Sequence, residues 1–283
     1  KCIETLDKRR FDRALLGSGD AFRHIVSLVP LLLHLNHPAL PGYVEDAPAG
    51  IADFILSNYQ QNFLSKEYPE LVEDVQSAVN SDAVFAPILG IYVMGSFGSI
   101  SQTSASDLDI WICHQDDLSE QDQQRLAEKT KKISQWASTF HVEMHFYLMT
   151  QKRFRNERYS DPLTKENSGS AQYMLLLEEF YRSAVRLSGK PLLWLHLWVD
   201  DEKQYEAEVA RLMAEGELNP NDWVDFGGLG QFSASEYFGA SLWQLYKGID
   251  SPYKSVMKIL LLETYAQEYP NAHLIARQFK EDL

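Results

Sequence analysis

The stretch from Ile88 to Cys113 constrains the fold of this chain more than any other. "ILGIYVMG" (Ile88–Gly95) is rich in aliphatic and β-branched residues and ends at glycine, which predicts a buried strand. "DLDIWIC" (Asp107–Cys113) alternates in polarity, as a second strand would. One face would carry Leu108, Ile110 and Ile112, and the other would carry Asp107, Asp109, Trp111 and Cys113. The sequence therefore predicts a sheet with one apolar face and one face that bears two carboxylates.

Further elements follow this pair of strands. "HVEMHFYL" (141–148) alternates again and places Glu143 on a polar face with His141, His145 and Tyr147. A helix is expected after Ser119, where Ser119 and Asp122 can form a capping pair. A long helix is expected near Ser170–Ser188, ended by Gly189.

The pattern divides the chain into three segments. Residues 1–80 are mostly of helical periodicity, interrupted by the Pro/Gly break "PALPGYVEDAPAG". Residues 81–190 hold the strands, and residues 191–283 are helical again, with capping signals at Ser233 and at Ser251-Pro252. We expect an α+β fold in which a mixed-sheet catalytic core is flanked by an N-terminal helical segment and a C-terminal helical subdomain.

Composition excludes several classes of protein. The 283 residues carry a net charge of -14 with a pI near 5.0, which argues against a general nucleic-acid coat and predicts no nucleic-acid partner. The two cysteines, Cys2 and Cys113, are far apart in sequence, so a disulfide framework and a zinc site are not expected, and a reducing cytoplasmic location fits. No apolar run approaches the roughly 20 residues of a membrane span.

The two aspartates point to a metal site. Alternation places Asp107 and Asp109 on one side of a strand, roughly 7 Å apart along it. Like charges at this spacing are usually accommodated by a raised pKa or by a bound cation. Mg²⁺ prefers carboxylate oxygens combined with substrate phosphates, and two such ions can serve a phosphoryl displacement. Glu143 on the next strand is the candidate third carboxylate.

The small residues between the strands are candidates for phosphate binding. The Gly95-Ser96 turn lets backbone N–H groups approach phosphate oxygens, and Ser96, Ser104 and Ser106 could donate hydroxyl groups. Taken alone, the Gly/Ser-rich stretch could be a flexible loop. Taken alone, the two aspartates could lie on an exposed strand face. Their combination favours a functional site, and the Walker A and EF-hand patterns do not match. "DFG" occurs at Asp225–Gly227, but the other protein-kinase motifs are missing, so "VDFGGLG" is predicted to be a loop between helices.

These motifs resemble a known superfamily. Met94-Gly95-Ser96 followed by Asp107-Leu108-Asp109-Ile110 resembles the signature of the nucleotidyltransferases that include DNA polymerase beta. More closely, four segments resemble the N-terminal catalytic region of enterobacterial class I adenylate cyclases. They are "VPLLLHLNHPALPGY", "YVMGSFGSISQTSASDLDIWICHQ", "LLLEEFYRSAVRLSGK" and "DFGGLGQFSASEYFGASLWQLYKGIDSPYKSVMKILLLETY".

The resemblance implies conversion of ATP to 3',5'-cyclic AMP and pyrophosphate on a nucleotidyltransferase-like fold. Asp107 and Asp109 would hold two Mg²⁺ ions, with Mn²⁺ able to substitute, and Glu143 would complete one metal site or act as base. In the family, a C-terminal regulatory region coupled to a sugar-transport phosphorelay follows the catalytic region. Two alternatives stay open: nucleotide transfer to a separate acceptor, and a non-catalytic nucleotide-sensing domain.

Further candidates concern the triphosphate and the base. Lys254 and Lys258 lie four apart at the start of one helix, and Lys247 ends the preceding helix. The resemblance to superfamily members in which a helical subdomain lends a lysine to the triphosphate implies that Lys254 and Lys258, and after them Lys247, bind phosphates. A solvated helix edge is the alternative. Trp111 is expected either beside the nucleotide or in the core. The sequence leaves open the adenine-reading residues, the oligomeric state, the activator and whether this region is active alone.

Overall fold

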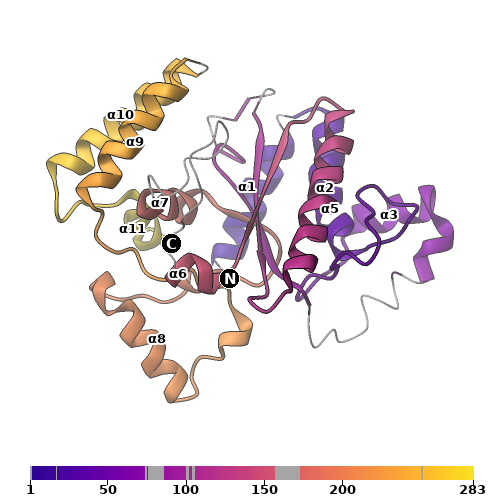
Figure 1. Cartoon of the computed structure of the whole chain (residues 1–283), viewed down its shortest axis with the longest axis horizontal. Coiled ribbons are helices and arrows are strands. Elements are labelled where there is room, and N and C mark those ends of the chain that lie inside the picture. The colour runs from indigo at the N-terminus through magenta and orange to yellow at the C-terminus, as the bar shows by residue number, and fades with distance from the viewer. Residues whose placement is uncertain are drawn as a thin grey trace. The chain divides into compact units, whose positions relative to one another are not determined.

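The chain folds into two compact units, seen here in a computed structural model (Figure 1). The structure describes residues 2–16, 18–73, 75, 86–99, 102–103, 106–156, 173–249 and 251–283. Within these ranges, the first unit takes residues from 1–151, 184–191 and 221–224, and the second takes residues from 152–183, 192–220 and 225–283. The N-terminal helices therefore belong to the same unit as the sheet, while the predicted domain limits at residues 80 and 190 stay a prediction.

A four-stranded mixed sheet forms the centre of the first unit. Its strands are β1 (Ile88–Met94), β2 (Leu108–His114), β3 (Met144–Met149) and β4 (Val185–Gly189). Their order is β3-β2-β1-β4, with β1 antiparallel to both β2 and β4, and with β2 parallel to β3. The three strands predicted from the sequence are confirmed, and β2 lies between the other two. The fold is α+β, as expected.

One face of the sheet carries the core of the first unit. In the β1–β2 register Ile91 lies opposite Ile112 and Val93 opposite Ile110, so these apolar side chains share a face, and they are at most 1% exposed. The described helices of this unit are α1 (Cys2–Leu16), α2 (Asp20–His34), α3 (Asn58–Glu67) and α5 (Glu120–Ser138), with a 3-10 turn at Pro69–Leu71. Residues of α2 and α5 join the same cluster, and Figure 1 shows both helices beside the sheet. The predicted apolar face of β2 is therefore the core face.

A buried lysine ties α5 to the end of α2. Lys129 is fully buried, and its Nζ donates to the carbonyl oxygen of Leu35 at 2.7 Å and to Oδ1 of Asn36 at 3.0 Å. Leu35 is the C-cap of α2, so the lysine satisfies a carbonyl at a helix end that has no partner within the helix. Burial lowers the pKa of Lys129 to about 8.

One prediction about secondary structure is wrong. The helix expected near Ser170–Ser188 is, in the described residues, α7 (Tyr173–Ser183), and the chain then turns into strand β4. Val185 pairs with Val93, and Gly189 pairs with Gly90 at an approach so close that a Cβ on Gly189 would clash with the β1 backbone. A five-residue strand directly after a helix has too few residues to show its own periodicity, and its pairing with β1 decides its conformation.

The second unit is largely helical. Its described helices are α6 (Gln151–Asn156, which starts in the first unit), α7, α8 (Tyr205–Ala214), α9 (Ala234–Lys247), α10 (Pro252–Gln267) and α11 (Ile275–Glu281), with 3-10 turns at Leu193–Leu195, Glu202–Gln204 and Pro220–Asp222. Helices α9 and α10 lie side by side, and α7 contacts both α9 and α11 (Figure 1). Ser233 caps α9, as predicted. Ser251 is the N-cap residue of α10 and Pro252 its first residue, as predicted, but the Ser251 side chain makes no capping hydrogen bond.

The "VDFGGLG" segment is a loop, as predicted, and a buried carboxylate shapes it. Asp225 is 7% exposed and accepts hydrogen bonds from Arg155 at 2.8 Å, from the Tyr205 hydroxyl at 2.9 Å and from the Gly227 amide at 2.9 Å. The hydroxyl of Tyr181 donates to the Gly227 carbonyl. Asp225 therefore has a structural role in this loop. That role explains the "DFG" tripeptide without any kinase chemistry.

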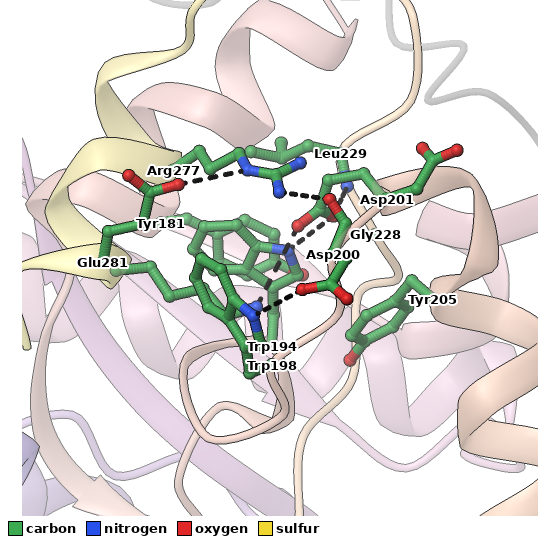
Figure 2. Close-up of polar contacts among 12 residues, drawn as sticks. Tyr181, Trp194, Trp198, Asp200, Asp201, Tyr205, Gly228, Leu229, Arg277 and Glu281 are labelled. Atoms are coloured by element: carbon green, nitrogen blue, oxygen red, sulfur yellow. Dashed lines mark hydrogen bonds and ion pairs between the residues drawn. The ribbon is translucent and has the colours of Figure 1, made fainter.

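Helix α11 is held by two cations that face two tryptophans. The Nζ of Lys280 lies 4.2 Å from the ring centroid of Trp194, and the guanidinium of Arg277 lies 5.6 Å from that of Trp198. Arg277 also donates to the Asp200 carbonyl, a contact drawn in Figure 2. Burial lowers the pKa of Lys280 to about 8. These contacts anchor α11 to the loop that precedes α8.

No helix in the described ranges is long and apolar enough to cross a membrane.

Replacing the buried lysine tests the tie between α2 and α5. Lys129→Met should lower the free energy of unfolding by about 1–3 kcal/mol, because the Leu35 carbonyl loses its partner away from water. Urea unfolding followed by circular dichroism measures the change. Lys131→Met, at an exposed position two residues along the same helix, should change the free energy of unfolding by less than about 0.5 kcal/mol. Equal effects of the two substitutions would contradict this role.

Candidate functional site

Asp109 lies beside the turn that follows β1. It pairs with Met94, the last residue of β1, so the next residue, Gly95, is close to its carboxylate. Gly95 has a φ of 86°, and a Cβ built on it would lie 4.0 Å from Oδ2 of Asp109. A left-handed backbone at this point favours glycine, and the missing side chain leaves space directly at the carboxylate. The predicted neighbourhood of Gly95 and Asp109 is therefore present.

A tyrosine from β3 orients Asp109. The hydroxyl of Tyr147 donates to Oδ1 of Asp109 at 3.2 Å. Tyr147 lies opposite Trp111 in the parallel β2–β3 pair, and Asp109 is two residues before Trp111 on the same face. The sequence placed Tyr147 on the polar face of its strand but assigned it no role. The missing information was the parallel register, which brings the two side chains within reach.

Asp107 and Glu143 lie at the same end of two paired strands. The Leu108 amide donates to the Glu143 carbonyl at 3.0 Å, so the residues that precede β2 and β3 run alongside each other. Both residues are exposed. Glu143 has a side chain 74% exposed, and its Oε1 lies 3.1 Å from Nε2 of His145. The carboxylate of Glu143 thus contacts a side chain of β3, the strand that it precedes.

The carboxylates do not form a ready-made three-ligand metal site. Among the described residues, no three side chains of His, Cys, Asp or Glu are arranged to hold a metal ion. Asp107 directly precedes β2, Asp109 is the second residue of this strand, and Asp109 lies beside the Gly95 turn. This set fits a magnesium ion that takes one or two carboxylates and completes its coordination with water and substrate phosphate.

The small-residue turn has internal hydrogen bonds of its own. Gly98 has a φ of 66°, and its amide donates to the side chain of Gln102 at 2.7 Å. The Ser96 carbonyl accepts from Ser99, and the Ser106 hydroxyl accepts from the Thr103 amide at 2.9 Å. Ser104 lies outside the described residues. The glycines thus have conformational reasons to be present, and phosphate binding by Gly95, Ser96, Ser104 and Ser106 stays a prediction.

Trp111 lies in the interior. It is 2% exposed and pairs with the equally buried Tyr92 on the face of the sheet that carries Asp109. This is the core position that the sequence left open as one of two alternatives. A contact between Trp111 and a nucleotide stays a prediction.

The three candidate lysines differ in their surroundings. Lys258 lies 2.8 Å from Oε1 and 2.9 Å from Oε2 of Glu179, which ties α10 to α7. Burial alone would raise the pKa of Glu179, but Lys258 and then Arg182 hold it down at about 2. Lys254 is exposed, and the Nζ of Lys247 lies 5.4 Å from the ring centroid of Trp243. The charge of Lys258 is therefore already paired within the second unit, and Lys254 is the most accessible of the three.

Comparison with known proteins shows the family. A family model described as "Adenylate cyclase NT domain" matches residues 1–195, and one described as "Adenylate cyclase, class-I, second domain" matches residues 232–283. Together, the two family models match most of this chain, including the sheet and the acidic pair at the start of β2. The chain belongs to the class I adenylate cyclase family.

Curated relatives agree with this assignment. The chain is 70% identical to the adenylate cyclase of Haemophilus influenzae over 99% of its length, 62% identical to that of Pasteurella multocida over 100%, and 45% identical to that of Escherichia coli K12 over 99%. It spans about a third of the length of these relatives (33–34%). A solved spectinomycin adenyltransferase from Enterococcus faecialis matches 80% of this chain and 97% of its own at 15% identity. Its TM-score of 0.29 is too low to carry an argument about the fold.

Direct metal binding tests the acidic pair without any assay of activity. Mn²⁺ titration followed by electron paramagnetic resonance should show binding that Asp109→Asn weakens by about tenfold or more, which equals about 1.4 kcal/mol. The reason is the loss of a hard oxygen ligand. The matched control is Asp117→Asn, in the exposed turn after β2, which should bind Mn²⁺ as the parent chain does. Equal affinity of both variants would remove Asp109 from the metal site.

Proposed function

We propose that this chain is the catalytic part of an adenylate cyclase that converts ATP to 3',5'-cyclic AMP and pyrophosphate. The observation that carries the proposal is the acidic pair at the start of β2, beside the open Gly95 turn, in a chain of the class I adenylate cyclase family. Because the chain spans only about a third of its relatives, the activity, the substrate and the partners of the whole protein are part of the proposal.

The proposed reaction is an intramolecular displacement at the α-phosphorus of ATP. The ribose 3'-oxygen forms a bond to the α-phosphorus, the bond from that phosphorus to the bridging oxygen breaks, and pyrophosphate leaves with the bonding electrons. The proton of the 3'-hydroxyl passes to a base. Asp107 and Asp109 would hold Mg²⁺, or Mn²⁺ in its place, and two such ions would acidify the hydroxyl and offset charge on the leaving group.

The side chains around the acidic pair have distinct proposed roles. Tyr147 keeps the Asp109 carboxylate in one orientation by its hydrogen bond. Glu143, exposed at the end of the neighbouring strand, would supply a further oxygen ligand or accept the proton, and its contact with His145 would be exchanged for one with the substrate. Gly95 and Ser96, together with Ser104 and Ser106, would approach the phosphates.

Lysines of α9 and α10 are the proposed ligands that balance the charge of the triphosphate. Lys254 is exposed and is the first candidate, with Lys247 second. For Lys258 the proposal includes exchange of its Glu179 partner for a phosphate oxygen, or stabilisation of α10 through that ion pair. Beyond this chain, a C-terminal region that responds to a sugar-transport phosphorelay is the proposed partner, in the cytoplasm.

A product assay tests the reaction. ATP labelled at the α-phosphate, with Mg²⁺ and no added acceptor, should yield labelled cyclic AMP, resolved by chromatography. Asp107→Asn and Asp109→Asn should each reduce turnover by about 100-fold or more, equal to about 2.7 kcal/mol of transition-state stabilisation. The Asp117→Asn control should keep full turnover and so exclude a general effect of lost acidic charge.

Two other outcomes would replace the proposal. Label on an added RNA, protein or small molecule without cyclic AMP would establish transfer to a separate acceptor. Nucleotide binding that is unchanged by the loss of both aspartates, with no product at all, would indicate a nucleotide-sensing domain.

The two neighbouring lysines should separate binding from stability. Lys254→Met should raise KM for ATP about tenfold or more with an unchanged melting temperature, because an exposed cation is removed. Lys258→Met should lower the free energy of unfolding by about 1–3 kcal/mol, because Glu179 loses its charged partner. Steady-state kinetics and thermal unfolding measure the two effects. A raised KM for Lys258→Met alone would make that lysine the phosphate ligand.

A further inference from the structure

Helices α9 and α10 carry an unusual amount of exposed apolar surface. Nine large apolar side chains on them or at their ends are between 45% and 89% exposed. They are Phe238, Leu242, Leu245, Tyr246 and Ile249 along α9, and Tyr253, Val256, Met257 and Leu260 along α10. Monomeric proteins rarely expose contiguous apolar patches larger than a few hundred Å², so this set requires an explanation.

The exposed residues follow helical spacing. On α9 they recur at intervals of three, four or one, and on α10 they occupy positions i, i+3, i+4 and i+7 from Tyr253. Residues at these intervals lie on one side of a helix. Each helix therefore has one continuous exposed apolar stripe, here called the α9 stripe and the α10 stripe.

Both helices already bury a different side. Helix α9 buries Ala240 and Trp243, and α10 buries Leu262 and Tyr265, and most of these residues join the small core of the second unit. A helix with apolar residues on more than one side is normally enclosed by other elements. The stripes thus have the apolar composition of a protein core, although they are exposed.

The family comparison indicates which part of the full-length protein could cover the stripes. The model of the second domain of class I adenylate cyclases matches from residue 232, two residues before α9, through residue 283. A segment of this size buries only a modest fraction of its surface and is marginally stable by itself. The curated relatives are about three times as long as this chain, so they contain ample polypeptide beyond the matched region.

The end of the described chain is itself firmly placed on the second unit. Helix α11 packs against α7, and its Arg277 and Lys280 lie over the rings of Trp198 and Trp194. Any polypeptide that continues from it therefore leaves from a fixed position on the same unit as α9 and α10.

We propose that the α9 and α10 stripes are the docking surface for the polypeptide that follows residue 283 in the full-length protein. The docked segment is apolar on the side that faces the stripes, and it completes the core that begins with α9. The proposal rests on family membership and on the exposed side chains, and it is independent of whether the chain makes cyclic AMP.

Cysteine labelling in the full-length protein tests this docking. In a background where Cys2, which is exposed, and any cysteine beyond residue 283 are replaced by serine, Met257→Cys is placed in the α10 stripe. Met213→Cys in α8 is the matched control, a methionine on a helix outside the stripes. Met257 is 67% exposed and Met213 is 43% exposed, so without a cover Met257→Cys should react with a maleimide at least as fast.

If the stripes are covered as proposed, the order of the two reaction rates reverses. Met257→Cys should react at least about tenfold more slowly than Met213→Cys in the native full-length protein, and both should react alike in urea. Phe238→Cys extends the test to the α9 stripe and should be protected in the same way. Circular dichroism confirms that each variant is folded before its rate is used.

Three results would overturn the proposal. The first is a native Met257→Cys that reacts as fast as Met213→Cys. The second is protection that disappears on dilution, which would assign the stripes to a second copy of the chain. The third is protection that appears only with anionic phospholipid vesicles, which would assign them to a lipid surface.

Discussion

The interior position of β2 is the constraint on which the rest of the first unit depends. Hydrogen bonds to β1 on one side and to β3 on the other leave the strand a single register. A shift by one residue would move Asp109 to the face that packs against α2 and α5 and would move an isoleucine to the opposite face. It would therefore bury a carboxylate in the apolar cluster that contains residues of α2 and α5. The hydrophobic core thus holds the acidic pair in position.

Charged side chains that are buried or half-buried hold the helices of both units. Lys129 joins α5 to the end of α2, Lys258 joins α10 to Glu179 of α7, and Asp225 organises the loop before α9. Each of these three charged groups has a partner of its own. A buried charge without a partner would destabilise the fold by roughly several kcal/mol. The same rule distinguishes two candidate phosphate ligands. Lys258 already has a carboxylate partner in Glu179, whereas Lys254, four residues earlier, is exposed.

Much of the fold could be predicted from local patterns. Strands around Ile88, Asp107 and His141, the helix after Ser119 and the loop at Asp225 all appear where alternation, capping and glycine indicate them. Strand β4 could not be predicted, because its five residues adopt an extended form only through pairing with β1. The contact between Tyr147 and Asp109 was also missed, because it depends on a parallel register between strands separated by a whole helix.

The sequence by itself determined which residues can share a face, since the period of a strand or helix is a local property of the backbone. It therefore placed Asp107 and Asp109 opposite the apolar residues of β2, and it placed Lys254 and Lys258 on one helix. Only the tertiary structure decided which faces meet. It buried Trp111, paired Lys258 with Glu179, directed Glu143 toward His145 and left two apolar stripes uncovered, because those outcomes depend on contacts between segments far apart in the chain.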